Sequence, residues 1–358
     1  MLHDINKNHE IAALNLEGRT IKGVWKVKQL LKKEPGQSGA VFSIPYLVEK
    51  DGKTYFMKAF NFGTFFQMQS SDGQNTSNVL RKMLEAYEYE KDLSIRCQEH
   101  YVTKVSCVTD FNEEFVDGFS VPYVPCLIFE LATHGDVRKM LSFSKQLDDA
   151  WRFKSLHDIA LGLRQLHTID ISHQDLKPSN VIVFENEESK LCDLGRSVCS
   201  KLKGPYDNRS FTGDGNYAPP EIWYGYYDKD WNRRSFAIDC YMLGSMVVFY
   251  FTHTTMSALL AKHLPEEFHF LKWKGSYEEL IPYMKKAFAE SLDKIKECIH
   301  GSIFEEDIIW LITLLCNPFP EERGHPSNQK KSNPYTMEQF ISKFDLLRHK
   351  AEIHLKKF

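Results

Sequence analysis

The sequence predicts an α+β fold with two lobes, a small antiparallel β-sheet lobe that carries one helix and a larger lobe that is mainly α-helical. The 358 residues are 42% hydrophobic and 26% charged, which is enough apolar material for one large domain or two lobes. Strand-like patterns fill much of the first third of the chain, and helical periodicity dominates the rest. Four segments are expected: an N-terminal extension (1–20), the sheet lobe (21–133), the helical lobe (134–345) and a C-terminal helical tail (346–358).

The sheet lobe is predicted from short apolar segments that are bounded by turn signals such as Asp51-Gly52. One stretch, 75–97, has the spacing of a helix and interrupts the strands once. This pattern favours an antiparallel sheet with one helix against it. The predicted strands are 25–31, 40–48, 53–60, 102–111 and 125–131.

The two lobes are predicted to meet near Thr133, after which the chain turns largely helical. A short hairpin at 181–191 is the exception. The segments with helical spacing and length include 160–167, 235–251, 277–299, 305–316 and 337–357.

The composition argues against several classes of protein. A formal net charge of -3 gives no general attraction to nucleic acid. The eight cysteines form no CxxC pair and no zinc-type spacing with histidine, which favours reduced thiols and a cytoplasmic location. The first residues lack the charged and apolar regions of a signal peptide, and no uninterrupted apolar run reaches the roughly 18 residues of a membrane span. We therefore expect no nucleic-acid partner and no membrane insertion.

The chemistry is concentrated in the stretch HQDLKPSN, which contains Asp175, Lys177 and Asn180, and in the CDLG that follows the predicted hairpin and contains Asp193. Transfer of a phosphoryl group needs hard oxygen ligands for magnesium, a cation that offsets phosphate charge, and a carboxylate that orients a hydroxyl and takes its proton. Asn180 and Asp193 supply the metal oxygens, Lys177 the cation and Asp175 the carboxylate. Each requirement has a residue here.

At these spacings HQDLKPSN and DLG resemble the catalytic and metal-binding loops of the eukaryotic-type protein kinases. The resemblance spans roughly residues 20–345. It implies a bilobal protein-kinase-like fold, ATP and Mg²⁺ as cofactors, and a protein substrate. Lysine two residues after the catalytic aspartate is the pattern of serine/threonine kinases, so serine or threonine hydroxyls are the expected acceptors.

The nucleotide-binding motifs of that family follow in the same order. EPGQSGAV resembles the loop that covers the phosphates, with matches at Gly36, Gly39 and Val41 and with Glu34 in place of the first glycine. Lys58 lies on a predicted strand where the family places the lysine that holds the α and β phosphates. The resemblance therefore assigns these residues to ATP binding.

The lysine needs an acidic partner on the predicted helix, and three glutamates are candidates: Glu85, Glu88 and Glu90. Glu90 shares a helical face with Met83 and Tyr87, the residues that we expect to pack on the sheet. The other two glutamates rotate toward solvent. We therefore predict Glu90 as the partner of Lys58.

The segment PCLIFELATHGD corresponds to the hinge between the lobes of a kinase. The resemblance implies that the backbone of Glu130 and Ala132 hydrogen-bonds the adenine and that Phe129 is the gatekeeper residue. Asp136 is expected to meet the ribose hydroxyls or a basic residue of the substrate.

GDGNYAPPE resembles the end of a protein-kinase activation segment, which small-molecule kinases generally lack. The resemblance implies that Glu221 pairs with Arg323 as a buried structural pair, and that Asp239 braces the catalytic loop through backbone N–H groups. Four hydroxyls of the activation segment are candidates for self-phosphorylation: Ser197, Ser200, Ser210 and Thr212. The candidate phosphate partners beside them are Arg196, Lys201, Lys203 and Arg209.

Four further positions depart from the family pattern, and none removes a catalytic group. Gln174 replaces the arginine that grips an activation-segment phosphate, so activation by phosphorylation should not be obligatory. Leu194 replaces phenylalanine, which is a conservative packing change. Phe56 replaces a small alanine above the adenine, so the nucleotide pocket is tightened or reshaped. Asp214 replaces a threonine that touches the catalytic aspartate; it would raise a carboxyl pKa or pair with Lys177, and it affects the choice of substrate residue.

The favoured function is an ATP-dependent serine/threonine protein kinase that also phosphorylates itself. Two alternatives stay open, a pseudokinase scaffold that binds nucleotide without phosphotransfer, and a kinase of small molecules. The complete catalytic set argues against the scaffold, and GDGNYAPPE argues against the small-molecule enzyme. Regulation is expected from a protein partner, from self-association or from the domain itself.

Overall fold

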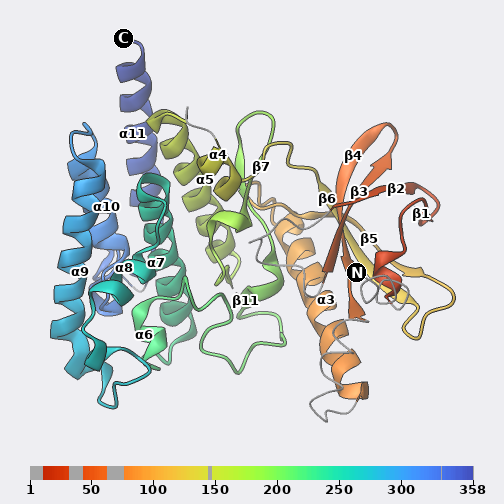
Figure 1. Cartoon of the computed structure of the whole chain (residues 1–358), viewed down its shortest axis with the longest axis horizontal. Coiled ribbons are helices and arrows are strands. Elements are labelled where there is room, and N and C mark those ends of the chain that lie inside the picture. The colour runs from red at the N-terminus through yellow and green to blue at the C-terminus, as the bar shows by residue number, and fades with distance from the viewer. Residues whose placement is uncertain (1–10, 32–42, 63–75, 144–146, 332, 358) are drawn as a thin grey trace, which may run out of the picture. The chain divides into compact units, whose positions relative to one another are not determined.

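The computed structural model describes residues 11–31, 43–62, 76–143, 147–331 and 333–357 (Figure 1). The chain divides into two compact units. Unit 1 holds residues 1–101 and 106–133, and unit 2 holds residues 102–105 and 134–358.

Unit 1 is built on a six-stranded sheet in which every neighbouring pair of strands is antiparallel, in the order β1-β2-β3-β4-β6-β5. The 24-residue helix α3 (Thr76–Glu99) packs against this sheet (Figure 1). The predicted small sheet with one long helix is confirmed within the described residues. The strands are β1 (Thr20–Ile21), β2 (Trp25–Leu30), β3 (Ser43–Lys50), β4 (Lys53–Phe60), β5 (Val108–Phe115) and β6 (Tyr123–Glu130).

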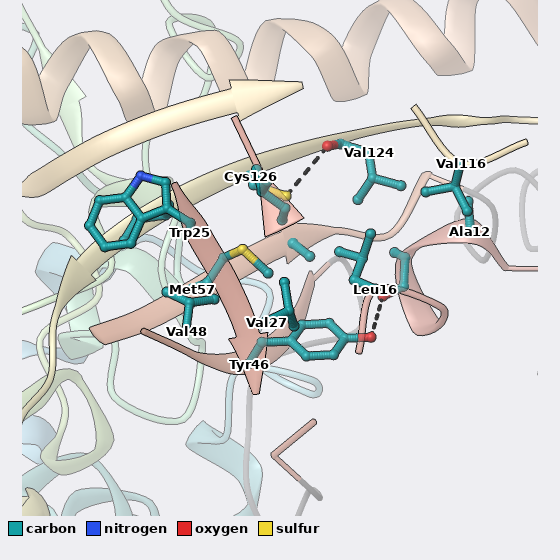
Figure 2. Packing of buried hydrophobic residues seen from close by; sticks show 14 of the residues in the cluster. Ala12, Leu16, Trp25, Val27, Tyr46, Val48, Met57, Val116, Val124 and Cys126 are labelled. Carbon is teal, nitrogen blue, oxygen red and sulfur yellow. Dashed lines mark hydrogen bonds between the residues drawn. The ribbon is translucent and has the colours of Figure 1, made fainter. Parts of the chain in front are cut away.

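Strand alternation gives the sheet two apolar faces. On one face Met57 of β4 lies in a core with Trp25, Tyr46 and Cys126 (Figure 2). On the other face Phe60 of β4 packs with residues of α3 and with Leu127. Lys58 lies between Met57 and Ala59, which are both fully buried, so its side chain points to the α3 face.

The N-terminal residues are part of this core, so the predicted boundary at residue 20 is wrong for the described residues 11–20. The short 3₁₀ helix η1 (Ala12–Leu14) contacts β3 and β6, and Leu16 belongs to the same apolar core. The hydroxyl of Tyr46 donates a hydrogen bond of 2.8 Å to the carbonyl oxygen of Ala13. Burial of these apolar side chains stabilises residues 11–16 as part of unit 1, so they do not form a separate extension.

The strand predicted at 102–111 begins only at Val108, because residues 102–105 belong to unit 2. There the Leu191 N–H donates to the Lys104 carbonyl at 2.9 Å. The Lys104 ammonium bonds Asp158 and Glu188, each at 2.8 Å. Burial alone would lower the pKa of Lys104, but these two hydrogen-bonded carboxylates raise it above its ordinary value. Sequence periodicity does not register such a long-range ion pair.

Unit 2 is mainly helical, as predicted. Its apolar centre is α7 (Trp231–Thr252). This helix is long and apolar enough to cross a membrane, but 83% of its most apolar 18-residue stretch is buried inside the fold, as in the core helix of a globular unit. The other helices are α4 (Val137–Phe143), α5 (Asp149–Thr168), α6 (Pro220–Trp223), α8 (Met256–His263), α9 (Tyr277–Ile299), α10 (Glu305–Leu315) and α11 (Glu338–Leu355).

Several helices of unit 2 begin with a side-chain cap. The side chain of Asp148 accepts from the Trp151 N–H before α5, and Ser276 with Glu279 forms a reciprocal capping box at α9. Helix α11 packs on α5 and runs without a break through residue 345. The tail predicted at 346–358 is therefore not separate, because the buried face of α11 continues through Leu347 to Ala351.

Short strands and 3₁₀ turns position the functional loops of unit 2. The predicted hairpin is present as β9 (Val181–Val183) and β10 (Ser189–Leu191), and β7 (Gly135–Asp136) adds to its β9 edge. Strands β8 (Ile171–Ser172) and β11 (Val198–Cys199) pair immediately before and after the loops HQDLKPSN and CDLG. Both loops are thereby held at their ends by backbone ladders.

Candidate active site

The predicted partner of Lys58 is confirmed in unit 1. Both carboxylate oxygens of Glu90 lie 2.8 Å from the Lys58 Nζ, and Glu90 is only 4% exposed. The alternatives point elsewhere: Glu85 is exposed and lies 3.8 Å from Arg81, and Glu88 bonds Lys91. The helical face that Glu90 shares with Met83 and Tyr87 brings it to the sheet, and both of these residues pack there.

Two phenylalanines lie next to this pair on the same sheet face. Phe56 of β4 is the direct cross-strand neighbour of Phe129 of β6, and their ring centres are 6.4 Å apart. Phe56 is two residues from Lys58 and therefore shares its face of the strand. Both rings are half-buried. The predicted crowding of this face by Phe56 thus has a specific neighbour, Phe129.

The remaining nucleotide-side predictions have no test in the geometry. Glu34, Gly36, Gly39 and Val41 lie outside the described residues. Glu130 ends β6 with an exposed side chain 3.3 Å from the Lys53 ammonium, and Ala132 is half-buried in the segment that follows. The hinge role of both backbones stays a prediction.

In unit 2, the carboxylate of Asp175 is surrounded by hydrogen-bond donors. Its Oδ2 accepts from Asn180 Nδ2 at 3.0 Å and lies 3.0 Å from Lys177 Nζ. Its Oδ1 accepts from the backbone N–H of Asp214 at 2.9 Å. All four residues come from two loops, and this network brings the two predicted catalytic side chains, Asp175 and Lys177, together with the predicted metal ligand Asn180.

Asn180 and Asp193 are brought side by side by the hairpin between them. The Cys192 N–H donates to the Asn180 carbonyl at 3.0 Å, which places the next residue, Asp193, beside Asn180. Asn180 uses its Nδ2 on Asp175, so its Oδ1 is the atom left to face a cation. Asp193 is exposed and has a left-handed backbone with φ of 63°. Two hard oxygen donors suit Mg²⁺, which takes few protein ligands and completes its shell with phosphates and water.

In the part of the chain that the structure describes, no other cluster offers an alternative metal site. Within the described ranges, no group of three or more His, Cys, Asp or Glu side chains is arranged to hold a metal ion.

Asp239 of α7 braces the catalytic loop through backbone N–H groups, as predicted. Its carboxylate accepts from the backbone N–H groups of His173 and Gln174, each at 2.9 Å, and from Ser172 Oγ at 2.9 Å. His167 of α5 adds a fourth contact at 2.8 Å, which the sequence did not predict. Burial would raise the pKa of Asp239, but the hydrogen bond and charge of His167 and the Gln174 N–H outweigh burial and lower it.

His173 itself links the two loops. Its Nε2 lies 3.2 Å from the Cys192 carbonyl and its Nδ1 lies 3.3 Å from the Asp175 N–H. One ring nitrogen therefore faces an acceptor and the other a donor, and a proton on Nε2 satisfies both contacts. The ring is fully buried. His173 thereby positions Asp175 relative to the DLG segment.

Gln174, the residue that replaces an arginine, has a structural role that the sequence did not reveal. It is 2% exposed, has a φ of 63°, and its Nε2 donates to Ser172 Oγ at 2.8 Å and to the Ser235 carbonyl at 3.2 Å. Its amide group is therefore bonded within the catalytic loop and to the start of α7. The only sign of this role in the sequence is that a shorter neutral amide stands where the family has a long cationic arginine.

The activation segment lies directly on the catalytic loop. A Cβ atom at Gly213 would overlap the Gln174 carbonyl oxygen, so only glycine permits this approach. Two of the predicted phosphorylation candidates are buried: Ser197 is fully buried and donates to the His173 carbonyl at 3.2 Å, and Thr212 is 4% exposed and bonds Arg196. In this conformation neither hydroxyl can be phosphorylated, because both are buried and hydrogen-bonded within the loop packing.

The accessible hydroxyls are Ser200, which is exposed, and Ser210, which is half-buried. In the same segment of the chain, the guanidinium groups of Arg196 and Arg209 lie 5.5 and 5.7 Å from the Tyr206 ring centre. Aromatic contact holds these two cations in the middle of the segment.

The pair predicted between Glu221 and Arg323 is confirmed. Arg323 Nη1 and Nη2 bond the two carboxylate oxygens of Glu221 at 2.7 and 2.9 Å, and the guanidinium also donates to the carbonyls of Ala237 and Asn317. Arg323 is fully buried. Burial would lower the pKa of Arg323, but the charge and hydrogen bonds of Glu221 raise it. The end of the activation segment is thereby fastened to α7.

Asp136 has a local role in addition to the predicted one. Its Oδ1 accepts from the Lys139 N–H at 2.9 Å at the start of α4, and Arg138 Nε lies 4.0 Å away. The predicted contact with ribose or with a basic substrate residue stays a prediction.

The comparisons with known proteins agree with this architecture. The family model described as protein kinase domain matches residues 56–335. An Aurora kinase of Debaryomyces hansenii is 30% identical over 118 residues, which are 33% of this chain and 27% of that protein. The serine/threonine-protein kinase RUNKEL of Arabidopsis thaliana is 32% identical over 123 residues, which are 34% of this chain and 8% of RUNKEL.

A probable serine/threonine-protein kinase of Dictyostelium discoideum is 28% identical over 191 residues, which are 48% of this chain and 14% of that protein. The aligned segments thus cover between 8% and 27% of these three relatives. The family model, in contrast, covers most of this chain and includes every described residue of the catalytic cluster. The chain therefore belongs to the protein kinase domain family.

Proposed function

We propose that this chain is a serine/threonine protein kinase that transfers the γ-phosphoryl group of ATP in the presence of Mg²⁺. The arrangement around Asp175 is the observation that carries the proposal. Its carboxylate is fixed by Asn180, by Lys177 and by the Asp214 N–H. A carboxylate held in this way can orient an acceptor hydroxyl and take its proton, and orientation is the main contribution of a kinase to the reaction.

The donor set also suits the metal and the nucleotide. Asn180 Oδ1 and the Asp193 carboxylate would hold Mg²⁺, which when bound offsets the negative charge of the phosphates. Lys58 is assigned to the α and β phosphates, and its bond to the buried Glu90 keeps the ammonium group in one orientation. Lys177 is assigned to the transferred phosphoryl group.

The choice of serine and threonine rests on Lys177 within DLKPSN and on the printed names of the relatives. Self-phosphorylation is part of the proposal and is assigned to Ser200 and Ser210, which are the accessible hydroxyls of the four candidates. Because the Gln174 amide is already bonded within the catalytic loop, a phosphate in the activation segment is not required to order that loop. A cytoplasmic location is proposed from the cysteine pattern of the sequence alone.

The proposal is tested by intact-mass measurement of the purified chain with ATP and Mg²⁺, alone and with a generic basic protein as acceptor. We expect mass gains in steps of one phosphate, with peptide mapping that reports serine or threonine. Asp193→Ala should abolish the gain, whereas Asp117→Ala, at an exposed turn of unit 1, should not. No gain on either protein would refute the kinase activity; if ATP still raised the melting temperature, a nucleotide-binding scaffold would be favoured.

A further inference from the structure

The acceptor side of the catalytic cluster carries a carboxylate that the transfer reaction itself does not use. Asp214 Oδ2 lies 3.7 Å from the Lys177 Nζ, and the same ammonium lies 3.0 Å from the Asp175 Oδ2. One cation is therefore shared by two carboxylates. A threonine at this position would offer a neutral hydroxyl, so Asp214 adds a full negative charge to the cluster.

The other oxygen of Asp214 is already committed. Its Oδ1 accepts from both the backbone N–H and the side-chain Nδ2 of Asn216, each at 3.0 Å. The Oδ2 distance of 3.7 Å to Lys177 exceeds that of a hydrogen bond, so this oxygen retains capacity for a stronger donor.

The charges around this point do not cancel. Within the shared trio the acids are Asp175 and Asp214 and the cation is Lys177. Arg138 has an acid of its own, because its Nε lies 4.0 Å from Asp136. The charges of the trio also act on the hydroxyl of Tyr217: burial raises its pKa most, Asp214 and Asp175 raise it further, and Lys177 and Arg138 lower it. Two carboxylates against one cation leave the shared trio with an excess of one negative charge before Asp193 is counted.

Asp214 is the member of the shared trio that a substrate would meet first. Its side chain is 26% exposed, compared with 8% for Asp175 and 11% for Lys177. Its backbone cannot withdraw, because its N–H bonds Asp175 on one side and the Gly215 carbonyl accepts from the Trp223 indole at 3.2 Å on the other. The carboxylate is thus held at the surface, next to the group that orients the acceptor hydroxyl.

We infer that Asp214 is a specificity-determining residue that selects peptide substrates with a lysine or arginine close to the phosphoacceptor residue. The inference rests on the proposed kinase function and names its substrate class. A basic side chain that reaches Oδ2 neutralises the excess charge and leaves the Lys177 ammonium to the phosphoryl group. An acidic side chain at the same place adds a second uncompensated negative charge.

The test uses peptides of one common sequence with a central serine and with lysine, glutamine or glutamate placed singly at each of the three positions on either side. The value of kcat/KM is measured for the wild-type chain, Asp214→Asn and Asp207→Asn. Asparagine keeps the Oδ1 acceptor for Asn216 and removes only the charge. Asp207 is the matched control, because it is an exposed acid of the same segment that also accepts a backbone N–H, from Gly204.

We expect the wild-type chain to prefer lysine over glutamate by about tenfold or more at one or more of these positions, mainly through KM, as two charges within 4–6 Å require. Asp214→Asn should reduce that ratio about three- to tenfold. Asp207→Asn should keep the wild-type ratio. Asp214→Thr provides a second neutral variant if the asparagine variant folds poorly, and it should reduce the ratio by the same factor.

An unchanged lysine-to-glutamate ratio in both Asp214 variants would overturn the inference while the kinase function stands. Absence of transfer to every peptide by the wild-type chain would instead refute the proposed function. In that case binding of fluorescent lysine and glutamate peptides, measured by anisotropy, still decides the inference: equal affinities in the wild-type chain would reject it, and a lysine preference that Asp214→Asn removes would support it.

Discussion

The buried ion pair between Glu221 and Arg323 gives the sharpest stability prediction. The side chains are 3% and 0% exposed, and the guanidinium donates four hydrogen bonds: two to Glu221, one to Ala237 and one to Asn317. Glu221→Gln keeps the shape but removes the charge, and it turns one acceptor oxygen into an amide that faces the guanidinium donors. Breaking one side of a buried pair leaves the other charge uncompensated, which typically costs about 3–5 kcal/mol.

The measurement is urea unfolding followed by tryptophan fluorescence. Five of the six tryptophans lie in unit 2, so the signal reports mainly on the unit that contains the pair. Lys285→Met is the matched control, because Lys285 and Glu322 form a pair of similar length, 2.8 Å, whose side chains are 45% and 48% exposed. An exposed pair should contribute less than about 1 kcal/mol.

The double variant Glu221→Leu with Arg323→Met sharpens the comparison. It removes both charges but leaves the carbonyls of Ala237 and Asn317 without this donor, so it should recover only part of the loss. If Glu221→Gln cost no more than the exposed control, the reasoning from burial would be refuted. A double variant less stable than Glu221→Gln would also contradict it, because the uncompensated charge would then not be the main cost.

Three further predictions concern the catalytic cluster and its support. Glu90→Gln should lower kcat/KM about ten- to hundredfold, because a hydrogen bond between charged groups contributes roughly 1.5–3 kcal/mol. Glu85→Gln, at an exposed position, should leave kcat/KM unchanged. Equal effects of the two variants in a phosphate-transfer assay would count against the pairing of Lys58 with Glu90. Gly213→Ala should lower kcat and reduce the stability of the fold by about 1–3 kcal/mol, because its Cβ would overlap the Gln174 carbonyl of the catalytic loop. Gly215→Ala is the control, because a Cβ there meets open space. Thermal melting and initial rates measure both variants, and equal behaviour would exclude the steric cause. The lowered pKa of Asp239 stabilises the fold above the ordinary pKa of about 4, and this contribution is lost as the pH falls through the lowered value. In Asp239→Asn the free energy of unfolding should therefore fall less steeply below about pH 4. An unchanged slope, measured by urea unfolding at a series of pH values, would contradict the assignment.

Much of the fold and site could be predicted from sequence because the relevant signals are local. Strand alternation and turn residues located β2, β3 and β4, and helical spacing located α9 at the same bounds as the structure. The face shared by Met83, Tyr87 and Glu90 identified the partner of Lys58, because a helix projects its side chains at fixed angles along its length. The order of the motifs then predicted which groups carry the chemistry.

Other features could not be predicted, because they depend on what a residue packs against. Nothing in the composition of 11–20 distinguishes a loose extension from a segment buried on the sheet, and only the contact with Tyr46 decides it. The hydroxyls of Ser197 and Thr212 look like those of Ser200 in sequence, yet the first two are buried. Burial is a property of the whole fold and leaves no local mark on a single polar residue.

The sequence by itself determined which chemical groups this protein has, in what order, and on which local elements, since these follow from residue identity and from periods of two and 3.6 residues. The tertiary structure alone decided how those groups constrain one another. His167, Ser172 and Gln174 converge on Asp239 across 65 to 72 residues of chain, and Asp214 shares Lys177 with Asp175 across 39. Such contacts form only after loops have closed and apolar faces have been buried, so their geometry and electrostatics are set by packing and have no counterpart in local sequence pattern.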